Sequence, residues 1–137
     1  MADAVPILVG IQNAPQFIGI DLSDAGLVEL NRRRPNVSIF KAEGDAIQSD
    51  QLAEAAAGVF DLFNGRNGID LIDTLRAGFA GVIPSPDAVD VEARVYDLYW
   101  AGDTEEAERR FKEILPLIFH ALVSNLRLRD EIASART

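Results

Sequence analysis

The sequence predicts an α/β protein in which parallel strands are linked by helices and are followed by a helical C-terminal segment. Four short apolar runs each precede a longer amphipathic stretch, at intervals of roughly 20 to 30 residues. Strands joined through helices must run parallel, because a helical crossover returns the chain to the same end of the sheet. From about residue 87 onward the apolar positions follow a helical period.

The first unit begins with the apolar run 5–11, which is rich in β-branched residues and suits a strand buried on both faces. The segment 13–15 ends this strand at a proline. Ser23 then stands where a helix N-cap is expected, and Leu27 begins the apolar side of that helix. The sequence 32–35, three arginines and a proline, stops the helix.

The second unit has a strand over 37–41 and a helix over about 49–57, which Gly58 ends. The third unit has a strand over 59–63 and a helix over 69–77. Each strand is short, apolar and rich in β-branched or aromatic residues, as buried parallel strands are.

The fourth run, 79–83, is cut off by Pro84. Asp103 and Glu106 then resemble a capping box, which predicts that a helix starts there. One apolar stripe continues along this helix: Ala107, Phe111, Ile114, Leu115 and Ile118. We expect β/α units over 1–90 and C-terminal helices over 91–137, packed on the units without an intervening linker.

Two architectures fit this order of elements: a small open doubly wound sheet, or half of an eightfold β/α barrel. A complete barrel needs on the order of 200 to 250 residues. The chain has 137 residues, so it cannot form a whole barrel by itself.

Composition excludes several kinds of site and partner. The chain has no cysteine and one histidine, so disulfides, thiol catalysis and multi-histidine metal sites are excluded. A net charge of −9 disfavours nucleic acid and anionic membranes as partners. No stretch approaches the ~20 apolar residues of a membrane span, and no secretory signal begins the chain. We expect a soluble cytoplasmic protein.

Lys41 is one of only two lysines among thirteen basic residues, and it follows Ile39 and Phe40 at the end of a predicted strand. In parallel β/α proteins, ligands bind at that end of the strands. Burial disfavours a charged ammonium, and a neutral amine can attack a carbonyl carbon. Lys41 is therefore a candidate Schiff-base nucleophile. The alternative is a strand-end lysine that reaches solvent or pairs with Glu43.

The turn 65–68 lies between a predicted strand and a predicted helix. Its backbone N–H groups could hold an anion, or the segment is simply a tight turn of the kind that glycine and asparagine favour. It lacks the spacing and the Lys-Ser/Thr ending of a P-loop. The segment 12–15 offers polar amides at the same end of the sheet, and alone it indicates only a turn.

Taken in order, these landmarks resemble the C-terminal half of the dihydrodipicolinate synthase / N-acetylneuraminate lyase family. The landmarks are Gln12-Asn13-Ala14-Pro15, Phe40-Lys41-Ala42-Glu43, Phe63-Asn64-Gly65, the segment 77–84, and the helical tail 99–107 with 114–117. The resemblance covers essentially the whole chain. It implies a Schiff-base (class I) lyase acting on pyruvate or another 2-oxo acid, without a metal or cofactor, on a (β/α)8 barrel with appended helices.

The resemblance also implies roles for particular residues. Lys41 matches the lysine that condenses with the keto carbon, and Gln12 stands where many members have a proton-relaying tyrosine. Gly65 matches a glycine that shapes the pocket, with Asn64 beside it, and Ile83 matches a position whose main-chain carbonyl borders the keto acid.

Specificity follows from one further position. Phe17 replaces the arginine with which true dihydrodipicolinate synthases bind the aldehyde's carboxylate. The segment Gln12-Asn13-Ala14-Pro15 is more similar to that of members that handle 2-keto-3-deoxy sugar acids by aldol cleavage or dehydration.

The resemblance includes four of the family's eight strands and omits its Gly-rich carboxylate-binding segment. We expect two copies to pair, a separate N-terminal half-barrel chain to complement this one, or the sheet to collapse under its own helices. Two functions remain open: a lyase that is active once its barrel is completed, and a non-catalytic truncated half-barrel that associates through its open sheet.

Overall fold

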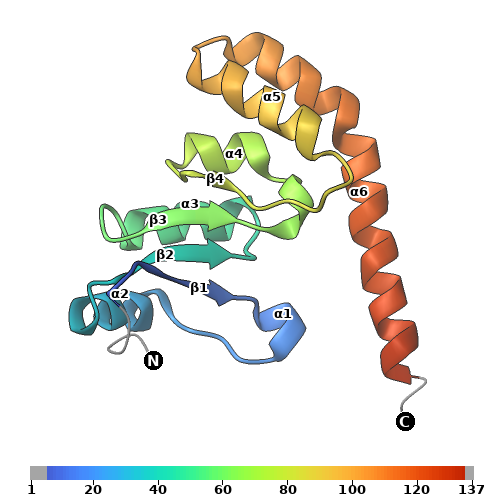
Figure 1. Cartoon of the computed structure of the whole chain (residues 1–137). Coiled ribbons are helices and arrows are strands. Elements are labelled where there is room, and N and C mark those ends of the chain that lie inside the picture. Colours follow the sequence, from blue (N-terminus) through green and yellow to red (C-terminus); the bar gives the residue numbers. More distant parts are fainter. Residues whose placement is uncertain (1–5, 135–137) are drawn as a thin grey trace. The chain divides into compact units, whose positions relative to one another are not determined.

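A computed structural model describes residues 6–134 of the chain (Figure 1). The chain divides into two compact units. Unit 1 comprises the residues up to 65 together with 70–83, and unit 2 comprises 66–69 and the residues from 84 onward. The predicted boundary at residue 90 stays a prediction.

Unit 1 is a parallel β/α sheet whose strands are neighbours in chain order (Figure 1). The strands are β1 (Val9–Asn13), β2 (Val37–Ala42), β3 (Asp61–Asn64) and β4 (Gly81–Val82), and every adjacent pair is parallel. A doubly wound sheet reverses its strand order at a switch point, whereas a β/α barrel adds each strand beside the previous one. The order β1-β2-β3-β4 therefore confirms the barrel-type architecture.

The helices of unit 1 are α1 (Pro15–Ile18), α2 (Asp24–Arg33), α3 (Ala46–Ala55) and α4 (Leu71–Arg76). Two of them, α2 and α3, begin at side-chain caps that the sequence supplies. Ser23 caps α2 as predicted, since its side chain accepts a hydrogen bond from the backbone N–H of Gly26. The predicted start of the next helix at residue 49 is wrong, because a capping box formed by Asp45 and Gln48 starts α3 earlier. The short helix α1 was not predicted.

We expect Asp45→Ala to lower the free energy of unfolding by about 1 kcal/mol, because it removes the acceptor that caps α3. The measurement is urea unfolding of the variant beside the wild type. Asp50→Ala is the matched control, since it removes the same charge from the interior of α3 and alanine is a better helix former there. Equal effects of the two substitutions would contradict the capping role.

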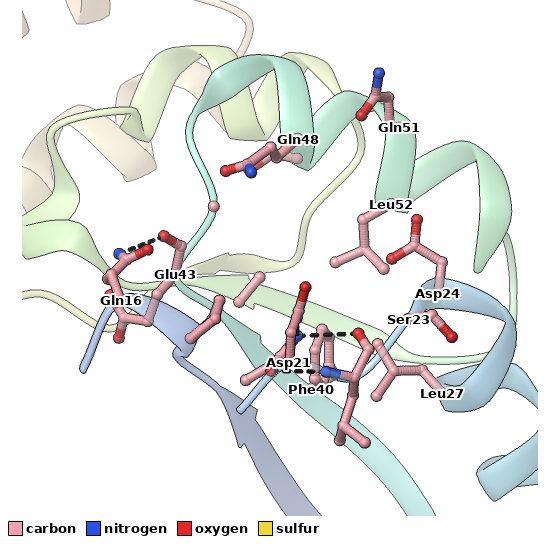
Figure 2. Close-up of a pocket in the computed structure, with 16 residues that line it drawn as sticks. Gln16, Asp21, Ser23, Asp24, Leu27, Phe40, Glu43, Gln48, Gln51 and Leu52 are labelled. Carbon is pink, nitrogen blue, oxygen red and sulfur yellow. Dashed lines mark hydrogen bonds between the residues drawn. The ribbon is translucent and has the colours of Figure 1, made fainter. Parts of the chain in front are cut away.

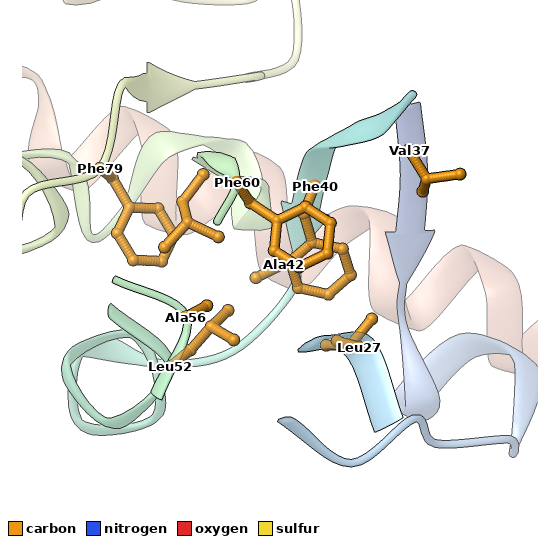
Figure 3. Close-up of a cluster of buried hydrophobic side chains, with 9 residues drawn as sticks. Leu27, Val37, Phe40, Ala42, Leu52, Ala56, Phe60 and Phe79 are labelled. Atoms are coloured by element: carbon orange, nitrogen blue, oxygen red, sulfur yellow. The ribbon is translucent and has the colours of Figure 1, made fainter. Parts of the chain in front are cut away.

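The core of unit 1 lies between the sheet and its helices (Figure 3). Phe40 of β2 is 1% exposed, and its ring centroid lies 5.8 Å from that of Phe60. The buried cluster consists of Leu27, Val37, Phe40, Ala42, Leu52, Ala56, Phe60, Leu62 and Phe79. Side chains alternate along a strand, so burying Phe40 and Ala42 against α2 and α3 leaves Lys41 on the other face of the sheet.

Two strand predictions need correction. The first strand is not buried on both faces: in β1, Gly10 and Gln12 are exposed, as are Ile7 and Leu8 just before it. The reason is that Gly10 and Gln12 lie on the face of the sheet opposite the helices, which no helix of unit 1 covers. The fourth strand is shorter than its apolar run, because only Gly81–Val82 pairs with β3.

Unit 2 contains α5 (Val89–Trp100), α6 (Thr104–Ser134) and a short 3-10 turn, η2 (Arg66–Gly68). Helices α5 and α6 pack against each other, and α6 also contacts η2. Of the predicted stripe on α6, Ala107, Phe111 and Ile118 are buried, whereas Ile114 and Leu115 are half-buried. No helix in the described part of the chain combines the length and the apolar content that a membrane crossing needs.

The turn η2 is strained, and it lies against a buried carboxylate. Arg66 and Asn67 have φ of 48° and 56°, in the left-handed region, and Gly68 has φ of 75°. A Cβ on Gly68 would overlap the carboxylate of Glu92 from α5, which is 2% exposed. Three buried side-chain atoms here have no hydrogen-bond partner among the described residues: both carboxylate oxygens of Glu92 and the amide nitrogen of Asn67. Burial raises the pKa of Glu92 to about 7.

Candidate active site

The strand register aligns three side chains on the face of the sheet opposite the helices. Lys41 of β2 is paired with Gln12 of β1 and with Phe63 of β3. Residues aligned across parallel strands share a face, so these three side chains form one row. In a closed β/α barrel, this is the face that points into the barrel.

Lys41 ends in a partly buried ion pair with Glu43. Its Nζ lies 2.8 Å from Oε1 of Glu43, and the two side chains are 22% and 6% exposed. The Gln12 amide donates a hydrogen bond of 3.1 Å to the same carboxylate oxygen. The structure thus brings together the two predicted catalytic positions, Lys41 and Gln12, around one carboxylate.

Glu43 is the residue that sequence analysis placed only as an alternative partner of Lys41. It follows β2 by one residue, and its backbone is held from both sides: its N–H donates to the Asn13 carbonyl at 3.2 Å, and its carbonyl accepts from the Gln16 amide at 2.8 Å. The signal was present in the sequence, because residues two apart on a strand point to the same face.

Gly65 lies directly beneath the Glu43 carboxylate. A Cβ built on Gly65 would overlap both carboxylate oxygens of Glu43, and the Gly65 N–H donates to the Ala42 carbonyl at 2.8 Å. This close approach is possible only because glycine has no side chain. Gly65 therefore shapes the environment of the Lys41–Glu43 pair.

The other two predicted pocket residues lie at the ends of β3 and β4. Asn64 is fully buried, and its amide donates to the Gly44 carbonyl and to Ser49 Oγ, both at 2.9 Å. It follows Phe63 by one residue, so its side chain lies on the helix side of the sheet and not beside Lys41. Ile83 has an exposed side chain, and its N–H donates to the Asn64 carbonyl at 2.7 Å.

A cavity of about 310 Å³ lies on the helix side of the sheet, at the carboxyl ends of β1 and β2 (Figure 2). Its apolar wall includes Phe40 and Leu27, and its polar wall includes Gln16, Asp21 and Gln48. Lys41 is not among its lining residues. Glu43, the ion-pair partner of Lys41, does line it, so the cavity reaches Glu43 but not the Lys41 amine.

Two further points concern the chemistry of the site. Within residues 6–134, no cluster of three or more His, Asp or Glu side chains could hold a metal ion. The backbone of Phe17 lies in α1, but its side chain lies outside the described part of the structure.

Comparison with solved structures finds this fold in dihydrodipicolinate synthase family members. A candidate dihydrodipicolinate synthetase from Pseudomonas aeruginosa is 26% identical with a TM-score of 0.75, over 85% of this chain and 41% of that chain. A family protein from Coccidioides immitis is 28% identical with a TM-score of 0.69, over 82% and 37%. A prophage protein of the family from E. coli K12, solved in complex with pyruvate, is 23% identical with a TM-score of 0.75, over 89% and 47%.

These structures confirm the family resemblance and the part-barrel fold predicted from the sequence. The chain spans about two fifths of the length of the first two structures. Comparison with protein-family models and with curated proteins gives no match.

Proposed function

We propose that this chain, which has the fold of one part of a dihydrodipicolinate synthase barrel, supplies the Schiff-base lysine of a lyase. The substrate class is pyruvate or a 2-keto-3-deoxy sugar acid, and the reaction is aldol cleavage, condensation or dehydration. Lys41 is the nucleophile. The observation that carries the proposal is the position of its amine, half-enclosed at the carboxyl end of a parallel sheet and on the face opposite the helices.

The net first step is balanced without any further reactant. The Lys41 ammonium and the keto group combine to give a protonated imine and one water molecule, so two hydrogens leave nitrogen with the carbonyl oxygen. In aldol cleavage, the electron pair of the carbon–carbon bond moves toward the positive imine nitrogen to give an enamine, and the departing fragment becomes an aldehyde as its hydroxyl group loses a proton. In dehydration, the carbon beside the imine loses a proton to give the enamine, which then expels the protonated hydroxyl group of the next carbon as water.

Four other predicted residues have supporting roles. A primary amide does not exchange protons as a phenol does, so Gln12 orients Glu43 through its 3.1 Å hydrogen bond and does not relay protons itself. Gly65 leaves space for Glu43. The Ile83 carbonyl at the end of β4 borders the keto acid, and Asn64 fixes the loop after β2.

A second set of strands completes the barrel around Lys41, from another copy of this chain or from a half-barrel partner. Two features support this proposal. In the described part of the chain, β1 and β4 are edge strands: each is hydrogen-bonded to a neighbouring strand on one side only, and its other edge is open to a further strand. Large apolar side chains are also exposed next to both edges: Ile7 and Leu8 before β1, and Ile83 after β4. Light scattering across a range of concentrations reports whether copies of the chain associate.

The function is tested by reductive trapping. Pyruvate with borohydride is expected to leave a covalent adduct on Lys41, found by mass spectrometry of the digested protein. The chain contains its own control, because Lys112 is the only other lysine and is 73% exposed beside Glu108. Lys41→Arg keeps a positive charge and is expected to abolish the adduct.

Modification of Lys112 with no adduct on Lys41 would contradict the proposal. If light scattering then showed association without an adduct for any keto acid, the result would favour the non-catalytic half-barrel. A 2-keto-3-deoxy sugar acid is the second substrate to try, because its longer chain distinguishes the two substrate classes.

A further inference from the structure

We propose that Glu43 holds the Lys41 amine in position in the free protein and carries a proton for it during formation of the Schiff base. This inference rests on the proposed function and adds a residue to its chemistry. It is drawn from the geometry around the carboxylate, which contacts the reacting nitrogen of Lys41 directly.

The geometry gives Glu43 one well-defined position. Oε1 accepts from Lys41 at 2.8 Å and from Gln12 at 3.1 Å, and the side chain is only 6% exposed. The absence of a side chain at Gly65 makes room for the carboxylate. The carboxylate therefore fixes the position of the Lys41 amine and lies within reach of its protons.

The same contact supplies a route for one proton. Glu43 accepts a proton from the Lys41 ammonium, and the neutral amine attacks the keto carbon while the carbonyl electron pair moves to oxygen. A second proton passes from nitrogen to that oxygen, giving a carbinolamine. Glu43 returns its proton to the hydroxyl group, which leaves as water, and the nitrogen lone pair forms the protonated imine. Charge and atoms balance, and Glu43 ends as it began.

The variant Glu43→Gln tests the proton transfer. Glutamine keeps the length of the side chain and can still contact the Lys41 amine, but it takes up no proton. Without the proton carrier, loss of water from the carbinolamine is slower.

The measurement is the rate of pyruvate adduct formation with borohydride, followed across pH. We expect the maximum rate of Glu43→Gln to be about 10- to 100-fold below that of the wild type. An equal or higher maximum rate would overturn the proposed role of Glu43 and leave Lys41 as the nucleophile. If the wild type forms no adduct at all, the proposed function itself fails.

Two variants separate this role from damage to the fold. Glu43→Asp keeps a carboxylate on a side chain one methylene shorter, and it is expected to recover part of the lost rate. Glu108→Gln makes the same replacement at the exposed pair on α6, where Nζ of Lys112 and Oε2 are 3.5 Å apart, and is expected to leave the rate at Lys41 unchanged. A purely structural role of Glu43 predicts that Glu43→Gln yields less folded protein and that the folded molecules react at the wild-type rate.

Discussion

Replacing Gly65 with alanine is expected to lower the free energy of unfolding by about 2 to 4 kcal/mol, because the new Cβ displaces the Glu43 carboxylate. The carboxylate can swing away, but it then loses its contacts with Lys41 and Gln12 and leaves the Lys41 ammonium half-buried without that partner. Urea unfolding gives the stability, and the pyruvate adduct is expected to weaken in parallel.

The double variant Gly65→Ala/Glu43→Ala tests whether the effect acts through Glu43. In the Glu43→Ala background, the additional loss from Gly65→Ala is expected to fall below about 1 kcal/mol, because no carboxylate remains to be displaced. Gly10→Ala is a matched control in the same sheet, since a Cβ there would meet Ile39 at 3.5 Å, an ordinary contact distance. An equal loss from Gly65→Ala in both backgrounds would show that Gly65 is required for another reason.

The barrel-type fold could be predicted from local signals because each unit carries its own. Ser23 caps α2, and Gly78, with φ of 90°, ends the helix before β4. Strand order could not be derived from those signals. A doubly wound sheet and a barrel segment use the same local units and differ only in which strands pair. Local signals therefore fit both architectures, and only the strand order of the structure distinguishes them.

The sequence predicts which residues belong to the candidate site but not how their side chains meet. Lys41 and Gln12 could be singled out because each lies at the carboxyl end of a strand. That they share one carboxylate depends on register, which places the two residues side by side. Asn64 shows the opposite case: it is adjacent in sequence to Phe63, yet alternation turns its side chain toward Ser49 and away from the Lys41 row.

Glu92 was overlooked although the sequence carried a signal for it. Ala88, Glu92 and Val95 are spaced at i, i+4 and i+7, and all three are buried on one side of α5. In a chain with 22 acidic residues, one glutamate at an apolar spacing does not by itself indicate a buried carboxylate. Its burial against Gly68 becomes evident only when the turn at η2 is placed beside α5 within unit 2.

Glu92 is expected to make the chain less stable as pH rises from about 4.5 to about 7. Its pKa is raised from 4.5 to about 7 by burial. Below pH 4.5 the carboxyl group is protonated in both the folded and the unfolded chain. Between the two values the unfolded chain releases a proton that the folded chain keeps, so the free energy of unfolding falls with pH. Above about pH 7 the folded chain also ionises, and the fall ends.

The size of this fall is about 2 to 3 kcal/mol, less than the full shift implies, because Glu92 lies in the first turn of α5 and the helix dipole favours its anion there. Other carboxylates interfere little in this interval. Glu29 and Glu106 pair with arginines, which lower the pKa of each to about 2, so both stay ionised throughout it.

Glu92→Gln isolates the effect, because glutamine has nearly the same shape and does not titrate. Urea unfolding of both proteins from pH 4.5 to pH 8 is the measurement. We expect the wild type to lose stability relative to the variant across that interval, and the variant to be the more stable of the two above pH 7. Parallel stability curves would mean that Glu92 reaches water in solution. The overall repulsion that comes with a net charge of −9 acts on both proteins and cancels in the difference.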